Sequence, residues 1–72
     1  MIFQHLTWFG FDAYAHEHRS LYKATRRIDV YIFDRDSVLM NHYIIPWMPD
    51  HRLKEWMMAR LKDVSKCQSP LC

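Results

Sequence analysis

The hydrophobic pattern of the chain is clearest in its middle, where two runs of β-branched and aromatic residues flank a short polar segment. Residues 27–33 (RIDVYIF) and 38–45 (VLMNHYII) are separated by residues 34–37 (DRDS). Two such runs joined by turn-forming residues are typical of a β-hairpin. Because side chains alternate between the two faces of a strand, both faces of this hairpin are expected to be apolar. The pattern therefore raises the question of what covers the second face.

A turn at residues 34–37 also predicts how the two strands pair. The expected cross-strand pairs are Phe33 with Val38, Tyr31 with Met40, and Asp29 with His42. The pair of Asp29 and His42 is the only acid–histidine pair that this register predicts. We interpret it as a cross-strand charge pair near the sheet edge.

Amphipathic patterns predict one helix before the hairpin and one after it. Apolar residues recur at helical spacing over residues 12–26, with Asp12 placed to cap the first turn. After Pro49, Asp50 is placed to cap a second helix that extends to about Val64. The apolar stripe of this second helix consists of Leu53, Trp56, Met57, Leu61 and Val64.

Together these elements predict a small single domain of the α+β class, an antiparallel β-hairpin packed by two α-helices. The apolar run from Ile2 to Phe9 can add a strand and make the sheet three-stranded, although such a run can equally begin a helix. We expect the domain to span residues 1–66 and residues 67–72 to form a flexible tail. Two helices on one side of the sheet would leave the other side for a partner, whereas one helix on each side would need none.

The composition indicates more apolar surface than a small core can hide. Half of the 72 residues are hydrophobic, including three Trp, four Tyr, four Phe and five Met. A chain this short buries only about 60% of the surface that it exposes when unfolded. We therefore expect part of the apolar surface to lie at an interface with another protein or with a second copy of the chain.

The sequence also bears on where the protein is found. Its longest apolar runs fall short of the ~20 residues that a membrane span needs, and residues 1–5 lack the basic start of a signal peptide. We therefore expect a cytoplasmic protein with no membrane partner. In that compartment Cys67 and Cys72 would remain free thiols.

Five histidines invite a metal or catalytic interpretation, but their spacing is unfavourable. On the predicted first helix, His16 and His18 would point in different directions and could not both hold one ion. Cys67 and Cys72 have no second Cys/His pair at zinc-finger spacing. Gly10 is the only glycine, so a glycine-rich phosphate loop is absent. We expect no enzyme activity, no metal, no cofactor and no small-molecule substrate.

A basic stripe is the second feature that points to a partner. Its four cations lie on one face of the predicted first helix and could follow a phosphate backbone: Arg19, Lys23, Arg26 and Arg27. Nearby aromatic side chains would permit base stacking. A small basic nucleic-acid-binding regulator is therefore the alternative hypothesis for function.

The favoured hypothesis is a non-enzymatic protein-binding module. A short, aromatic-rich chain without a site of its own is typical of inhibitors or adaptors that occupy a surface of a larger host complex, often encoded by phages or plasmids. Aromatic side chains tend to carry most of the binding energy of an interface. The expected partner-binding residues come from both hairpin faces: Tyr31, Phe33, Met40 and Tyr43.

Overall fold

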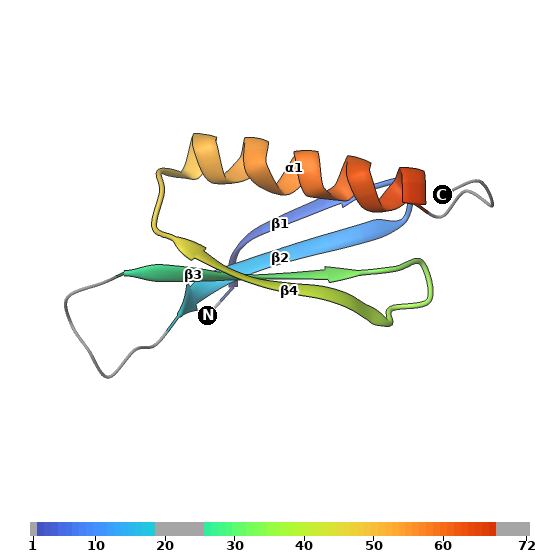
Figure 1. Cartoon of the computed structure of the whole chain (residues 1–72), viewed down its shortest axis with the longest axis horizontal. Helices are drawn as coiled ribbons and strands as arrows, with labels where there is room; N and C mark the ends of the chain where they lie inside the picture. The colour runs from blue at the N-terminus through green and yellow to red at the C-terminus, as the bar shows by residue number, and fades with distance from the viewer. Residues whose placement is uncertain (1, 19–25, 68–72) are drawn as a thin grey trace.

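The computed structural model describes residues 2–18 and 26–67 and consists of four strands followed by one helix (Figure 1). The strands are β1 (Ile2–Trp8), β2 (Phe11–His18), β3 (Arg27–Phe33) and β4 (Leu39–Pro46), and the helix is α1 (Asp50–Cys67). The strands form one antiparallel sheet in the order β1-β2-β3-β4, so each strand pairs with its neighbour in sequence. The described part of the chain is thus a small α+β fold. It contains no helix with the length and apolarity needed to cross a membrane.

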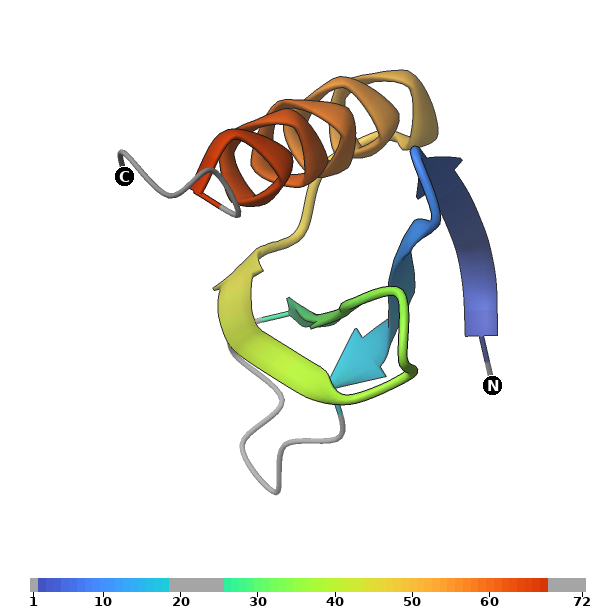
Figure 2. The ribbon, with the colours of Figure 1, turned by 90° about the vertical axis from the view of Figure 1, so that its right-hand side faces the viewer.

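The core lies between one face of this sheet and α1, as the view along the helix shows (Figure 2). Helix residues Leu53, Met57 and Leu61 are fully buried. They meet inward-facing residues of the inner strands: burial alternates along β2, and Ile28, Val30 and Ile32 of β3 share one face. The buried hydrophobic residues of the sheet are Phe11, Ala13, Ala15, Ile28, Val30, Ile32 and Ile45.

The predicted helix over residues 12–26 is wrong in its described part, because residues 11–18 form β2. The segment FDAYAHEH carries a period of two as well as a helical one, with Phe11, Ala13 and Ala15 on one side. Alanine favours helices in isolation, but β2 is hydrogen-bonded to a strand on each side, and this tertiary pairing overrides local propensity. Both alanines are fully buried, and α1 comes close to β2 at this point. Residues 19–25 of the predicted helix lie outside the described residues.

The other predicted elements are present with small changes in their ends. The N-terminal run forms the additional strand, β1, and because β2 replaces the predicted first helix the sheet is four-stranded and not three-stranded. The hairpin consists of β3 and β4 as expected. Helix α1 begins at Asp50 and ends at Cys67, three residues beyond the predicted end. Of the predicted flexible tail, residues 68–72 lie outside the described residues.

The register of the hairpin differs from the predicted one because its loop is longer. Tyr31 lies opposite His42 and Asp29 lies opposite Ile44, with an irregularity next to Phe33. Val38 belongs to the loop, where its carbonyl accepts a hydrogen bond from the Asp34 amide at 3.0 Å. The carboxylate of Asp34 in turn accepts hydrogen bonds from two loop amides, at 2.8 and 3.0 Å. This local network fixes the loop and shifts the register of β4.

The β1–β2 turn consists of Phe9 and Gly10, which both have positive φ, 48° and 84°. A two-residue turn with this geometry matches the twist of an antiparallel pair. The guanidinium of Arg35, from the β3–β4 loop, donates a hydrogen bond to the Phe9 carbonyl at 2.8 Å. The two turns at this end of the sheet are therefore tied together.

Candidate functional site on the open face of the sheet

The face of the sheet turned away from α1 carries most of the polar side chains of the four strands. We call it the open face, because no helix covers it within residues 2–18 and 26–67. Its residues follow from strand alternation and cross-strand pairing. They are His5 and Thr7 in β1; Asp12, Tyr14, His16 and His18 in β2; Arg27, Asp29, Tyr31 and Phe33 in β3; and Leu39, His42 and Ile44 in β4.

Aromatic and imidazole rings stack across the open face in two rows. In the first row, His16, Tyr31 and His42 stack nearly parallel across β2, β3 and β4, with ring centroids 5.3 and 4.3 Å apart. In the second row, the His5 ring stacks on Tyr14 at 4.3 Å, and Phe33 meets Tyr14 edge-on at 5.6 Å. Each contact joins directly opposed or diagonal neighbours, which are the pairs that interact in antiparallel sheets. The strands therefore hold the rings in fixed positions.

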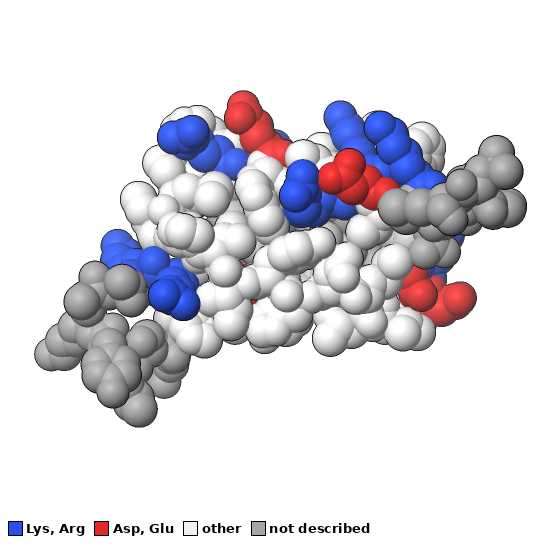
Figure 3. Space-filling view, viewed as in Figure 1, with Lys and Arg blue, Asp and Glu red and all other residues white. Residues whose placement is uncertain are grey.

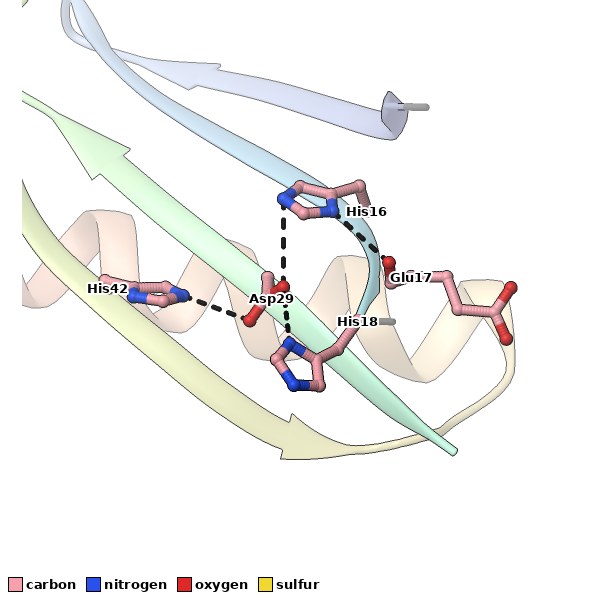
Figure 4. Close-up of polar contacts among 5 residues, drawn as sticks. All are labelled: His16, Glu17, His18, Asp29 and His42. Carbon is pink, nitrogen blue, oxygen red and sulfur yellow. Dashed lines mark hydrogen bonds and ion pairs between the residues drawn. The ribbon is translucent and has the colours of Figure 1, made fainter. Parts of the chain in front are cut away.

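A buried carboxylate lies among the histidines of the first row (Figure 4). Asp29 is only 4% exposed, and its two oxygens are 2.9 Å from His18 Nδ1 and 3.0 Å from His42 Nε2. His16 Nε2 is 3.8 Å away. Because an ionised carboxylate only accepts hydrogen bonds, these nitrogens of His18 and His42 must donate. Asp29 thereby fixes the orientation of side chains from both neighbouring strands.

The environment of Asp29 keeps its carboxyl group ionised. Burial by itself raises the pKa of Asp29, because it disfavours the charged form. The hydrogen bonds from His18 and His42, together with the charges of His18 and His16, outweigh this effect and hold the pKa below the ordinary value of 3.8. At neutral pH the cluster therefore contains a buried negative charge.

The contacts shown for this cluster are hydrogen bonds to Asp29 and stacking of rings. An imidazole held by a carboxylate can act as a general base when a hydroxyl or thiol lies within hydrogen-bond reach. Within residues 2–18 and 26–67, His18 and His42 make no such contact. The described residues also contain no group of three or more His, Cys, Asp or Glu side chains that could hold a metal ion.

A hollow of about 540 Å³ lies next to the cluster on the open face. Its volume falls within the range of about 300–1,000 Å³ that is usual for ligand pockets. Strands β2 and β3 and the β3–β4 loop form its walls, so it is built from two inner strands and a hydrogen-bonded loop. The lining residues are Asp12, Tyr14, His16, Tyr31, Phe33 and Ser37.

The structure divides the predicted partner-binding residues between the two faces. Tyr31 and Phe33 lie on the open face and line the hollow. Tyr43 lies on the covered face, where its ring meets Trp56 of α1 edge-on at 5.2 Å, and Met40 also packs against the core. Met40 and Tyr43 are therefore partly buried against the core.

The predicted basic stripe does not lie on a helix in the described part of the chain. Arg26 immediately precedes β3, where it forms an ion pair with Glu17 at 3.1 Å and lies over the Trp47 ring. Arg27 is the first residue of β3. Arg19 and Lys23 lie outside the described residues.

The β2 half of the site was missed because this segment was assigned to a helix. His16 and His18 point in different directions on a helix, but on a strand they share a face with Asp12 and Tyr14. The period-two pattern of FDAYAHEH was the signal that could have found them.

Comparisons with protein-family models, with curated proteins and with solved structures find no match to this chain. Its function therefore has to be argued from the open face itself.

Proposed function

We propose that this chain is a small, non-enzymatic protein-binding module that uses the open face to occupy a surface of a larger complex, as an inhibitor or adaptor. The observation that carries the proposal is the row of fixed rings on a sheet face that α1 leaves uncovered. Rigid aromatic side chains lose little conformational freedom on binding, which makes them effective anchors of protein interfaces.

Exposed aliphatic side chains on β4 extend this surface. Leu39 is 50% exposed and Ile44 is 49% exposed, and both lie on the open face. Strand β4 is also an edge strand of the sheet, and such strands can pair with a strand of another molecule. A protein partner, or a second copy of the chain, would thus find apolar contacts and backbone hydrogen-bonding groups side by side.

The distribution of charge favours a protein over a nucleic acid as the partner. On the side of the molecule seen in Figure 3, Lys and Arg side chains gather over α1 and at the end of the sheet where β3 begins. Nucleic-acid binding depends mainly on cations that contact phosphates. Within the described residues, Arg27 at one end of β3 is the only Lys or Arg on the open face.

Nucleic-acid binding remains the second candidate because bases could stack on the same rings. A titration of labelled single-stranded and duplex DNA and RNA at two salt concentrations separates the two functions. A nucleic-acid binder that makes about four phosphate contacts would show a log–log salt slope of about −3 to −4. We expect no binding of that kind.

The main test compares two surface variants of the folded protein. Light scattering first measures self-association, and tagged protein then captures partners from a lysate of the cells that make it. Tyr31→Ser changes the open face, and Lys54→Ser, an exposed position on α1, is the matched control. We expect Tyr31→Ser to lose self-association or specific partners that Lys54→Ser keeps. If both variants behave like wild type in both assays, the proposal is wrong.

A further inference from the structure

The hollow on the open face combines aromatic walls with a carboxylate. Tyr14, Tyr31 and Phe33 supply three rings, and Asp12 lies directly opposite Phe33 in the sheet. The rings are held by cross-strand contacts, as when Phe33 meets Tyr14 edge-on at 5.6 Å. The hollow therefore exists before any ligand binds.

One oxygen of the Asp12 carboxylate holds the side chain in place. Asp12 Oδ1 accepts hydrogen bonds from His5 at 3.0 Å and from Thr7 at 3.1 Å, both from β1. Its other oxygen makes no hydrogen bond within residues 2–18 and 26–67. A carboxylate can accept several donors, so Asp12 keeps capacity for a ligand.

The charge around the hollow is negative. Asp34 and Asp36 lie in the β3–β4 loop that forms one of its walls through Ser37, and acidic side chains are visible at that end of the sheet (Figure 3). Arg35 of the same loop is turned toward the neighbouring turn and lies over the Phe11 ring. Arg27 lies at the opposite end of β3. The hollow is thus complementary to a cation.

We infer that this hollow takes up the guanidinium or ammonium group of an arginine or lysine side chain from a basic segment of the partner protein. The faces of aromatic rings attract cations, and the attraction is stronger where water is excluded. Asp12 would accept a charge-assisted hydrogen bond from the same group. This inference rests on the proposed function and names the chemistry that the partner must present.

The experiment titrates the whole ¹⁵N-labelled protein with short blocked peptides and follows its amide signals by NMR. One peptide contains two arginines between glycines, and its control carries citrulline, which has the same shape without the charge. We expect the arginine peptide to shift the amides of Asp12, Tyr14 and Phe33, and to bind about fivefold or more tightly than the citrulline peptide. Equal binding of the two peptides, or shifts located elsewhere, would overturn the inference.

Two variants and a control identify the groups responsible. Asp12→Asn keeps the shape of the side chain, and Phe33→Leu keeps an apolar side chain without the ring; each should weaken the arginine peptide about threefold or more. Asp63→Asn removes an exposed carboxylate on α1 and should leave binding unchanged. If Asp12→Asn fails to fold, the citrulline comparison on the wild-type protein still decides the outcome.

The result can be separated from that of the proposed function. If the arginine peptide fails to bind while Tyr31→Ser still loses captured partners, the open face is an interface but the cationic ligand is wrong. If a single-stranded oligonucleotide shifts the amides of the hollow and the arginine peptide does not, nucleic acid is the ligand and both proposals fail.

Discussion

The two faces of the sheet are built from the same strands but follow different rules. On the covered face, β2 and β3 supply aliphatic and small residues that are fully buried, such as Ala15 and Val30. On the open face, the residues next to them in sequence are rings, histidines and the buried carboxylate of Asp29. One face thus obtains its order from close packing, and the other from ring stacking and hydrogen bonds.

This difference shows how a chain of 72 residues can hold an ordered set of rings on one face of its sheet. Packing against α1 fixes the backbone of β2 and β3 from one side. The open face then needs only short cross-strand contacts to hold its rings, because the strands already position them. Under the proposed function, alternate residues of the same strands would carry stability and recognition.

The largest difference between the faces should appear when a buried and an exposed aliphatic residue are both cut to alanine. Leu61→Ala removes a fully buried side chain of α1 and should lower the free energy of unfolding by about 2–5 kcal/mol. Ile44→Ala, on the open face, should change it by about 0.5 kcal/mol or less. Urea denaturation of both variants measures the difference. Similar losses would mean that the open face is covered in solution.

Asp29→Asn should have the next largest effect, with a characteristic pH dependence. Loss of a charged acceptor for two histidines should cost about 1–3 kcal/mol at neutral pH. Folding lowers the pKa of Asp29 below 3.8. Wild type should therefore be more stable than Asp29→Asn above about pH 4, and should lose this extra stability as the pH falls through the folded-state pKa. Denaturation of both proteins from pH 7 to pH 2 measures the difference in their free energies of unfolding. A difference that grows toward low pH would contradict the pKa shift.

Tyr31→Ser should separate recognition from stability. It removes the stacking of Tyr31 with His16 and His42, which should cost about 0.2–1 kcal/mol per cross-strand pair. Thermal melts monitored by circular dichroism test this expectation. Complete unfolding of the variant would show that the open face is part of the core, against the division of roles described above.

The smallest effect is expected at the turn between β1 and β2. Phe9 has a φ of 48° and is 70% exposed, so its side chain contributes little burial to offset the cost of this conformation. Phe9→Asn places an Asn-Gly sequence in a turn that favours it, and should raise the free energy of unfolding by up to about 1 kcal/mol. A loss of more than about 1 kcal/mol would show that the ring of Phe9 supports the fold.

The sequence predicts the elements whose pattern agrees with their local propensity. The hairpin follows from two runs of β-branched and aromatic residues around a turn segment, and α1 follows from a helical stripe that starts after Pro49. The pattern of β2 is compatible with both a helix and a strand, and only its hydrogen bonds to β1 and β3 decide between them. Such pairing is non-local, so a short window of sequence does not contain it.

The same limit explains which parts of the site could be predicted. Tyr31 and Phe33 lie in a strand that the pattern identifies, and the contact of Asp29 with His42 forms although the register is shifted. His16, His18 and Asp12 join the site only because β2 lies beside β3. The loop that begins at Asp34 is also longer than the predicted four-residue turn, and this extra length shifts the pairing of β3 with β4.

The most direct test of the account blocks one face at a time. In a Cys67→Ser, Cys72→Ser background, Ile44→Cys places a single thiol on the open face and Lys54→Cys places one on the outer side of α1. Each protein is labelled with a bulky maleimide, checked for folding, and assayed for self-association and partner capture. If the open face binds the partner, the label at position 44 abolishes the interaction and the label at position 54 leaves it intact. Retention of every interaction with the label at position 44 would contradict the claim that the open face binds the partner.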